Sequence, residues 1–166
     1  LGGRDSGFGV PVTRVGVRSN FVKTSADIDL HAENRFAFAT VHLHGQSTGN
    51  RPMFVSEQFS LDGEDAVSGF PTGAFAADEG VSVRVEAGKR LTLPGGLRGT
   101  WQPYAYASRA TGWQRAVTGT SEGRLTINGT GLGARVIAEV IESPVKALEL
   151  SLEMSRSRQE RVADPA

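Results

Sequence analysis

Two histidines, His42 and His44, stand two residues apart in an alternating segment, and this spacing places both imidazoles on the same side of a β-strand. A metal can use such a pair, because imidazole is a common Zn²⁺ ligand, but a site needs further ligands. The neighbouring sequence offers no third one. We therefore expect no metal, and we interpret both histidines as polar residues on the wet side of a strand.

The carboxylates of Glu149 and Glu153 are four residues apart, as in a helical acid pair, but they alternate with leucines. Alternation puts them on one strand face, where solvated side chains are expected rather than acid–base catalysts. The glycine row Gly129-x-Gly131-x-Gly133 has no helix pattern after it, so close strand packing explains it better than a phosphate-binding loop.

The remaining polar residues suggest no enzyme. Ser68, Ser108 and the three histidines form no ordered set of nucleophile, base and orienting group. We expect neither catalysis nor a cofactor.

Composition narrows the class of protein further. The chain has 166 residues, 18 basic against 18 acidic side chains and no cysteine. Zero net charge argues against a nucleic-acid partner, and the absence of cysteine excludes disulfides and thiolate metal sites. No apolar run is long enough for a membrane-spanning helix. The chain begins at Leu1 without a signal-like segment, so we expect a piece or mature part of a longer protein.

Alternating polar and apolar residues dominate the chain and predict an all-β fold. The first clear example runs from Phe36 to Ser47, where Val41 and Leu43 oppose His42 and His44. Six long strands of an antiparallel meander are predicted within a single partial domain, 1–166, at residues 21–32, 35–48, 80–93, 98–109, 122–141 and 146–156.

Short and long connections alternate between these strands. The predicted short turns lie at residues 32–34, 93–96 and 143–145, and the long connections at 49–79 and 110–123. Outer-membrane barrels have this arrangement of short periplasmic turns and long external loops. The first long connection is too apolar for disorder, so we expect a structured, functional loop.

The two faces of the strands are unusual for a soluble core. Small and medium apolar residues share one face, whereas Phe38, Tyr104 and Tyr106 share the polar face with charges. In a membrane barrel, lipid contacts the apolar face and the polar face lines a wet lumen. A half-buried soluble sheet shows the same alternation, so the pattern alone leaves both hypotheses open.

Six segments in order resemble the two-partner secretion transporters, the haemolysin-activator (ShlB/FhaC/HecB) branch of the outer-membrane barrel-assembly superfamily. The segments are Gly45-Gln46, Ser56–Gly63, Ala66–Phe70, Asp78–Gly80, Gln102–Tyr106 and Gly131–Arg135. They are similar to the family's GQ-ending strand, SEQF-x-LGG approach, VRGF or VRGY loop tip, GD-x-G return, QPF-x-F strand and AGLGLR strand.

This resemblance implies a sixteen-stranded barrel in the bacterial outer membrane, in contact with its lipid, with POTRA domains upstream. Its function would be to secrete or activate a large partner exoprotein. The loop at 49–79 would fold back into the lumen. The site residues implied are the tip (Val67, Ser68, Gly69, Phe70), its approach (Glu57, Gln58, Phe59, Gly63) and the inner-wall contact (Tyr104, Tyr106, Ser108).

Three departures from the family pattern stand out. Ser68 replaces the tip arginine and Ser108 replaces the wall aspartate, so both halves of the usual ion pair are missing. We expect the tip to reach the wall through Phe70 packing and neutral hydrogen bonds. Asp62-Gly63 replaces a glycine pair, and the charged segment 156–166 is predicted to lack the last strand.

Three functions are compatible with these features. The first is a translocator that secretes or activates a partner exoprotein. An outer-membrane assembly insertase of the same superfamily is the second. The third, from another class, is a soluble β-sandwich that binds a ligand through the long loop.

Overall fold

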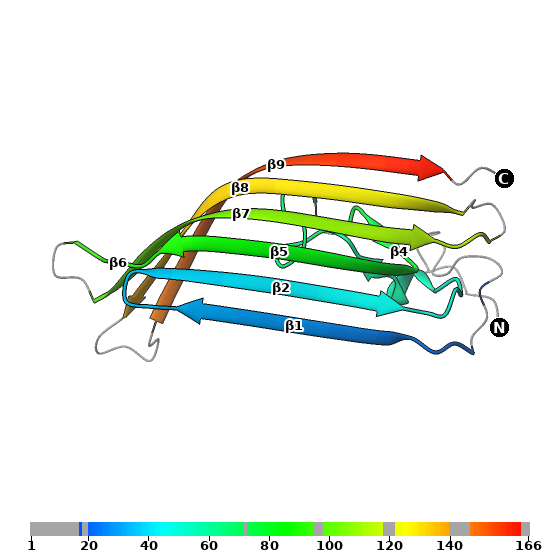
Figure 1. Cartoon of the computed structure of the whole chain (residues 1–166), viewed down its shortest axis with the longest axis horizontal. Coiled ribbons are helices and arrows are strands. Elements are labelled where there is room, and N and C mark those ends of the chain that lie inside the picture. The colour runs from blue at the N-terminus through cyan, green and yellow to red at the C-terminus, as the bar shows by residue number, and fades with distance from the viewer. Residues whose placement is uncertain are drawn as a thin grey trace, which may run out of the picture.

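The computed structural model describes residues 17, 20–71, 73–94, 98–117, 122–139 and 147–163. In this part of the chain, long strands join into one antiparallel sheet in the order β1-β2-β5-β7-β8-β9 (Figure 1). Each strand therefore pairs with its neighbours in sequence, and the all-β meander is confirmed; the sheet does not close. The long strands are β1 (Thr24–Glu33), β2 (Ala37–Ser47), β5 (Glu79–Lys89), β7 (Gly99–Gln114), β8 (Gly123–Glu139) and β9 (Ala147–Ala163).

Two strands, β7 and β9, extend further than the alternation predicted. β7 ends at Gln114 rather than near residue 109, and β9 continues past residue 156, pairing with β8 from Ala147↔Glu139 to Ala163↔Gly123. The charged residues after 156 therefore continue a strand, because backbone pairing with β8 does not require an apolar face. A short strand, β6 (Leu91–Thr92), pairs with β7. The predicted turns at 95–96 and 143–145 lie outside the described residues.

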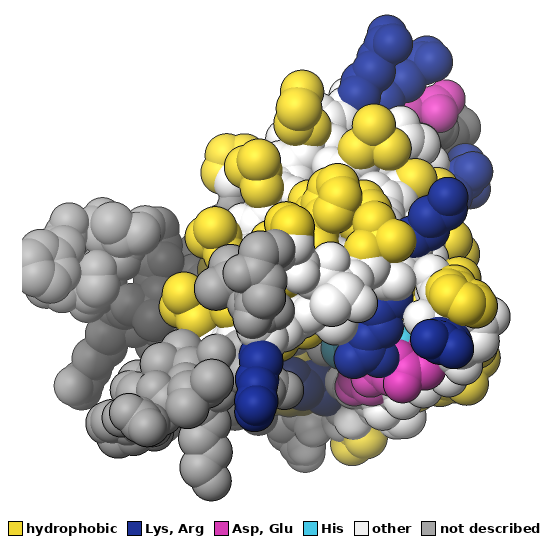
Figure 2. Space-filling model, turned by 90° about the vertical axis from the view of Figure 1, so that its left-hand side faces the viewer, with side chains coloured by type: hydrophobic (Ala, Val, Ile, Leu, Met, Phe, Trp, Pro, Cys, Tyr) yellow, Lys and Arg dark blue, Asp and Glu magenta, His cyan; other side chains and the backbone are white. Residues whose placement is uncertain are grey.

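The sheet buries its polar face and exposes its apolar face. On β5, Val81 and Val85 are 42% and 43% exposed, whereas Arg84 and Glu86 are 1% and 4% exposed. On β9 the apolar face includes Leu152 and Met154, which are among the most exposed hydrophobic residues. In Figure 2, hydrophobic side chains accordingly cover much of the surface seen from the short-turn end.

The long loop between β2 and β5 packs on the polar face. It contains a single 3₁₀ turn, η1 (Val55–Glu57), and a small hairpin of β3 (Phe59–Ser60) with β4 (Ala76–Ala77). In Figure 1 this segment lies behind the plane of the long strands. Within the described residues, no helix is long and apolar enough to cross a membrane.

Candidate functional site: the in-folded loop

An apolar cluster joins the loop to the inner side of the sheet, here called the wall. Phe59, Leu61 and Val67 come from the loop and pack with Ala110 of β7 and Ile127 of β8. Leu61, Val67, Ala110 and Ile127 are fully buried. Because hydrophobic burial is the main favourable term in folding, this cluster fixes where the loop lies against the wall.

Glycines in the wall make room for the loop. An added Cβ on Gly80 would overlap the Phe59 ring, and one on Gly112 would lie 3.0 Å from both terminal methyls of Leu61. A Cβ on Gly129 would lie 3.0 Å from Val67 Cγ1. These three glycines belong to three different strands, so the wall is shaped to receive the loop along its length.

Tyr104 and Tyr106 lie on two glycines of β8. An added Cβ on Gly133 would overlap the Tyr104 ring, and one on Gly131 would overlap the Tyr106 ring. This is the close strand packing expected for the glycine row, in which an aromatic ring covers a cross-strand glycine. Both tyrosines are buried on the polar face, as the interpretation of inner-wall residues requires.

The base of the loop is held by Asp78, which is fully buried. Its carboxylate accepts hydrogen bonds from the backbone N–H of Met53 (2.8 Å) and of Arg115 (2.7 Å), and from the Gln58 amide (3.2 Å). Its own N–H bonds to Trp113 O at 3.0 Å. One carboxylate thus connects the start of the loop, its end and the end of β7.

Glu79 adds a second carboxylate at the same place. It accepts the backbone N–H groups of Thr48 (2.9 Å) and Asn50 (3.0 Å) and pairs with the Arg115 guanidinium. Arg115 also pairs with Glu122 at 2.7 Å. Burial disfavours the charge of Arg115, but its hydrogen bonds to these two carboxylates outweigh burial and raise its pKa.

Asp62 explains one departure from the family pattern. Its side chain is 4% exposed, and its two oxygens accept the backbone N–H groups of Gly73 and Phe75, both at 2.9 Å. It also accepts the Ser60 hydroxyl at 2.8 Å. The aspartate thereby closes the loop across its own neck, and Gly63 provides the positive φ of 123° that the adjoining turn needs.

The tip residues lie against the wall. Gly69 has φ 97°, and an added Cβ there would overlap the Ser155 side chain of β9. Its carbonyl accepts a hydrogen bond from Ser157 Oγ at 3.4 Å. Phe70 packs edge to face on Phe75 at 4.9 Å, so its contact is within the loop and with the apolar cluster.

Arg84 of β5 holds the tip serine. Its Nη1 donates a 2.5 Å hydrogen bond to Ser68 Oγ, its Nε donates to Glu86 at 2.7 Å and its Nη2 donates to Glu153 of β9 at 2.6 Å. The guanidinium lies 3.9 Å from the ring centroid of Tyr106. Removing one member of such a buried set would leave an uncompensated charge, which makes the arrangement costly to break.

The expected neutral contact at the tip is therefore wrong in one respect. The bond to Ser68 comes from a charged donor, and charge-assisted bonds are roughly twice as strong as neutral ones. Ser108 of β7 is the direct register partner of Arg84, but its hydroxyl donates to Gly129 O at 3.4 Å. In this chain the arginine at the contact between tip and wall is therefore on the wall, at Arg84 of β5.

The approach residues have different environments. Gln58 bonds to Asp78 and Phe59 is buried, whereas Glu57 is half-exposed and pairs with Lys23 at 2.7 Å. The structure therefore brings Gln58 and Phe59 into the site but leaves Glu57 at its margin.

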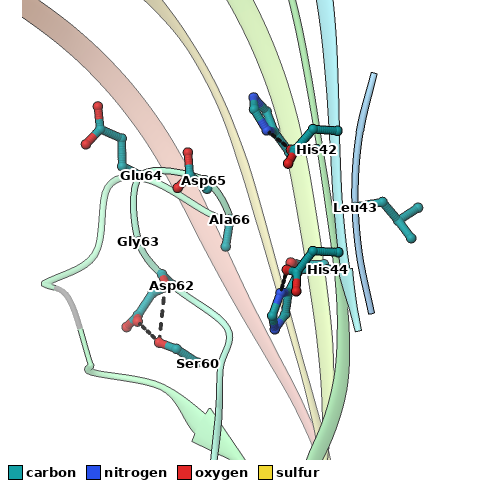
Figure 3. A pocket seen from close by; sticks show the side chains of 12 residues that line it. His42, Leu43, His44, Ser60, Asp62, Gly63, Glu64, Asp65 and Ala66 are labelled. Carbon is teal, nitrogen blue, oxygen red and sulfur yellow. Dashed lines mark hydrogen bonds and ion pairs between the residues drawn. The ribbon is translucent and has the colours of Figure 1, made fainter. Parts of the chain in front are cut away.

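The two histidines line a cavity between the wall and the loop, with a volume of about 400 Å³. Figure 3 shows His42 and His44 pointing toward the loop turn of Asp62 to Ala66, while Leu43 points to the opposite side of the sheet. His42 pairs with Asp29 at 2.6 Å, and His44 pairs with Asp27. Among the described residues, no three acidic or histidine side chains are grouped to hold a metal.

Arg84 is the main site residue that the sequence analysis did not single out. It stands in an alternating strand between two valines, where an arginine is expected to line a wet face. The sequence did contain a signal for an ion pair, because Glu86 lies two residues after Arg84 and therefore on the same face of the strand. The second partner, Glu153, is 69 residues away in sequence and lies on β9, three strands across the sheet from β5.

Comparison with known proteins agrees with this architecture. A family model described as haemolysin secretion/activation protein ShlB/FhaC/HecB matches residues 7–136. No curated protein and no solved structure gives a significant match. The family match spans most of the chain and includes the loop, its tip, the wall strands β1, β2, β5 and β7, and most of β8. The chain belongs to the ShlB/FhaC/HecB family of haemolysin secretion/activation proteins.

Proposed function

We propose that this chain forms wall strands and the in-folding loop of a bacterial outer-membrane translocator, which passes a large partner exoprotein through a polar lumen. The family consists of secretion/activation proteins, and this supports the class of function. Upstream POTRA domains and contact with outer-membrane lipid are part of the proposal. It requires no cofactor, metal or nucleic acid.

The observation that carries the proposal is the inverted polarity of the sheet. Arg84, Glu86 and Ser82 are buried, while Val81 and Val85 are exposed on the other face. A soluble β-sandwich would cover the apolar face with a second sheet, and no element of the described chain covers it. Lipid is the solvent that makes an exposed apolar face favourable.

The loop supplies the second part of the proposal. Its tip, Val67 to Phe70, lies on the inner wall where an unfolded chain would pass, so the loop must shift or guide the cargo. Gln58 and Phe59 position its approach, and Tyr104 and Tyr106 form the wall beside Arg84. The tip is therefore proposed as the moving part and the base as its hinge.

Two adjacent residues of β2 test the membrane orientation. Val41 is on the apolar face and Thr40 on the polar face, where it pairs in register with Glu86. Val41→Arg should lose assembly into membranes, because arginine at the lipid midplane costs about 2 to 4 kcal/mol. Thr40→Arg should assemble, since its charge can meet Glu86. Heat-modifiable migration of the full-length protein reports assembly.

Release of the partner exoprotein from cells then tests the transport function. Thr40→Arg protein that assembles should still secrete, and Val41→Arg should not. Equal assembly of both variants would contradict the assigned faces. A variant that assembles normally and leaves exoprotein release unchanged, but impairs the insertion of other barrel proteins, would favour an insertase.

A further inference from the structure

The outer face of the sheet changes character toward the long-loop end. Leu148, Leu150, Leu152 and Met154 of β9 continue along the same face as Arg156 and Arg158. Residues paired directly across strands lie on the same face, so the register extends this change to β8 and β7. Thr130 is opposite Arg156, and Asn128 is opposite both Arg158 and Arg109.

Four exposed arginines gather in this region, and we call them the arginine rim: Arg109, Arg124, Arg156 and Arg158. Glu160 shares the face with them, and by register so does Glu79, which pairs with Arg115. Within the described residues none of the recorded ion pairs involves these four guanidiniums. The rim is therefore a cationic surface directly beside the apolar band.

We propose that the arginine rim binds the phosphate groups of lipid headgroups at the membrane surface on the long-loop side. This inference rests on the proposed membrane orientation. Arginine matches phosphate because its planar guanidinium donates two parallel hydrogen bonds. The spacing also fits, since the rim begins one residue pair beyond the last apolar residue of β9, where the hydrocarbon layer gives way to headgroups.

The boundary between the two zones supports a lipid partner over a soluble one. On β5 the apolar face still includes Val81 and Val83, while on β7 the register partner of Val83 is already Arg109. The boundary thus crosses the strands diagonally, as a flat membrane surface must do when it meets tilted strands. A binding site for a soluble anion would have no reason to follow this line.

The test uses the full-length protein in phosphatidylcholine nanodiscs with or without lipid A, a glycolipid that carries phosphates. Native mass spectrometry measures the lipid A retained per protein. The variant R109Q/R156Q/R158Q should retain far less, because each basic residue near an anionic surface changes binding about fivefold. R109K/R156K/R158K should keep most of the binding, and Glu160→Gln should increase it.

The outcomes separate this inference from the proposed function. If the wild-type protein assembles in phosphatidylcholine but the glutamine variant retains lipid A equally, the rim proposal is wrong. If inorganic phosphate competes for lipid A as effectively as added lipid A does, the site is one for free phosphate and the proposal also fails. If the wild type does not assemble in either bilayer, the membrane orientation fails, and the rim proposal fails with it.

Discussion

The base and the tip of the long loop are both held to the wall, but by different kinds of contact. At the base, the carboxylates of Asp78 and Glu79 accept backbone N–H groups, and Asp62 does the same at the neck. At the tip, Ser68 accepts a side-chain bond from Arg84, the Gly69 carbonyl accepts one from Ser157, and Val67 packs in the apolar cluster. Three carboxylates hold backbone N–H groups at the base and neck, so we expect the base to be held more firmly than the tip.

This difference suggests how a loop can both close a lumen and move aside. Releasing the tip requires the Arg84–Ser68 and Ser157–Gly69 bonds to break and Val67 to leave the apolar cluster, while Arg84 keeps its two carboxylate partners. Releasing the base would leave several buried donors unpaired. We therefore propose that any movement of the loop during transport is confined to residues near 67–70.

The largest effect should come from breaking the base with Asp78→Ala. The change leaves two backbone N–H groups and the Gln58 amide without their acceptor. Each unsatisfied buried group costs about 1 to 3 kcal/mol, so we expect a loss of about 3 kcal/mol or more in unfolding free energy. Denaturant titration of the full-length protein measures this loss.

Asp78→Asn is the matched control for the base. It keeps one acceptor oxygen for Met53 but places a donor against the Arg115 N–H, so an intermediate loss is expected. If Asp78→Ala changed stability by less than 1 kcal/mol, as is typical of a surface position, the base would not be the fixed part.

The next largest effect should come from Gly69→Ala at the tip, compared with Gly73→Ala. Both residues have positive φ, 97° and 79°, so both substitutions carry a backbone penalty. Only the Gly69 Cβ would overlap Ser155, since nothing lies within 4 Å of the Gly73 Cβ position. Gly69→Ala should therefore displace the tip, whereas Gly73→Ala should only weaken the loop.

A single cysteine introduced at Val67, in a chain that has no other cysteine, reports on this displacement by its reaction with a thiol reagent. Labelling should be fast with Gly69→Ala and slow with Gly73→Ala. Equal labelling rates for the two variants would mean that the contact with β9 does not hold the tip.

Ser68→Ala should have a smaller effect. It removes one hydrogen bond to a charged donor, which is worth about 1.5 to 3 kcal/mol, and Arg84 retains its carboxylate partners. The tip should open more often while the base stays closed. Protease cleavage near 67–70, measured beside cleavage near 48–58, should increase at the tip alone.

The smallest effect should come from exchanging the two side chains, Ser68→Arg with Arg84→Ser. Ser68→Arg alone puts a second cation beside Arg84 and should destabilise the tip. The exchange leaves one arginine for Glu86 and Glu153, so the double variant should recover most of the loss. A double-mutant cycle without coupling would show that the tip serine and the wall arginine act independently.

The strands of this fold could be predicted because alternation with period two is a local signal. The alternation within residues 80–93 predicted β5 without knowledge of its neighbours. The end of β9 could not be predicted, since residues after 156 are charged and only pairing with β8 keeps them extended.

The site was less predictable because its contacts join distant residues. The resemblance directed attention to residues 67–70, but the arginine that meets them is on β5. The glycines Gly80, Gly112 and Gly129 gave no combined signal, because they come from three strands and become a single surface only in the folded sheet. In the sequence, Asp62 is only a departure from a motif. In the fold, its carboxylate oxygens accept the N–H groups of Gly73 and Phe75.

The most direct test of the central claim is a disulfide between the tip and the wall. The Cβ position of Gly129 lies 3.0 Å from Val67 Cγ1, so Val67→Cys with Gly129→Cys should crosslink in the assembled full-length protein. Val67→Cys with Leu132→Cys, whose side chain is on the outer face, is the control and should not crosslink. The account predicts a crosslink that stops exoprotein release and is reversed by reductant. Failure of the Val67/Gly129 pair to crosslink, in protein that assembles normally, would contradict an in-folded tip.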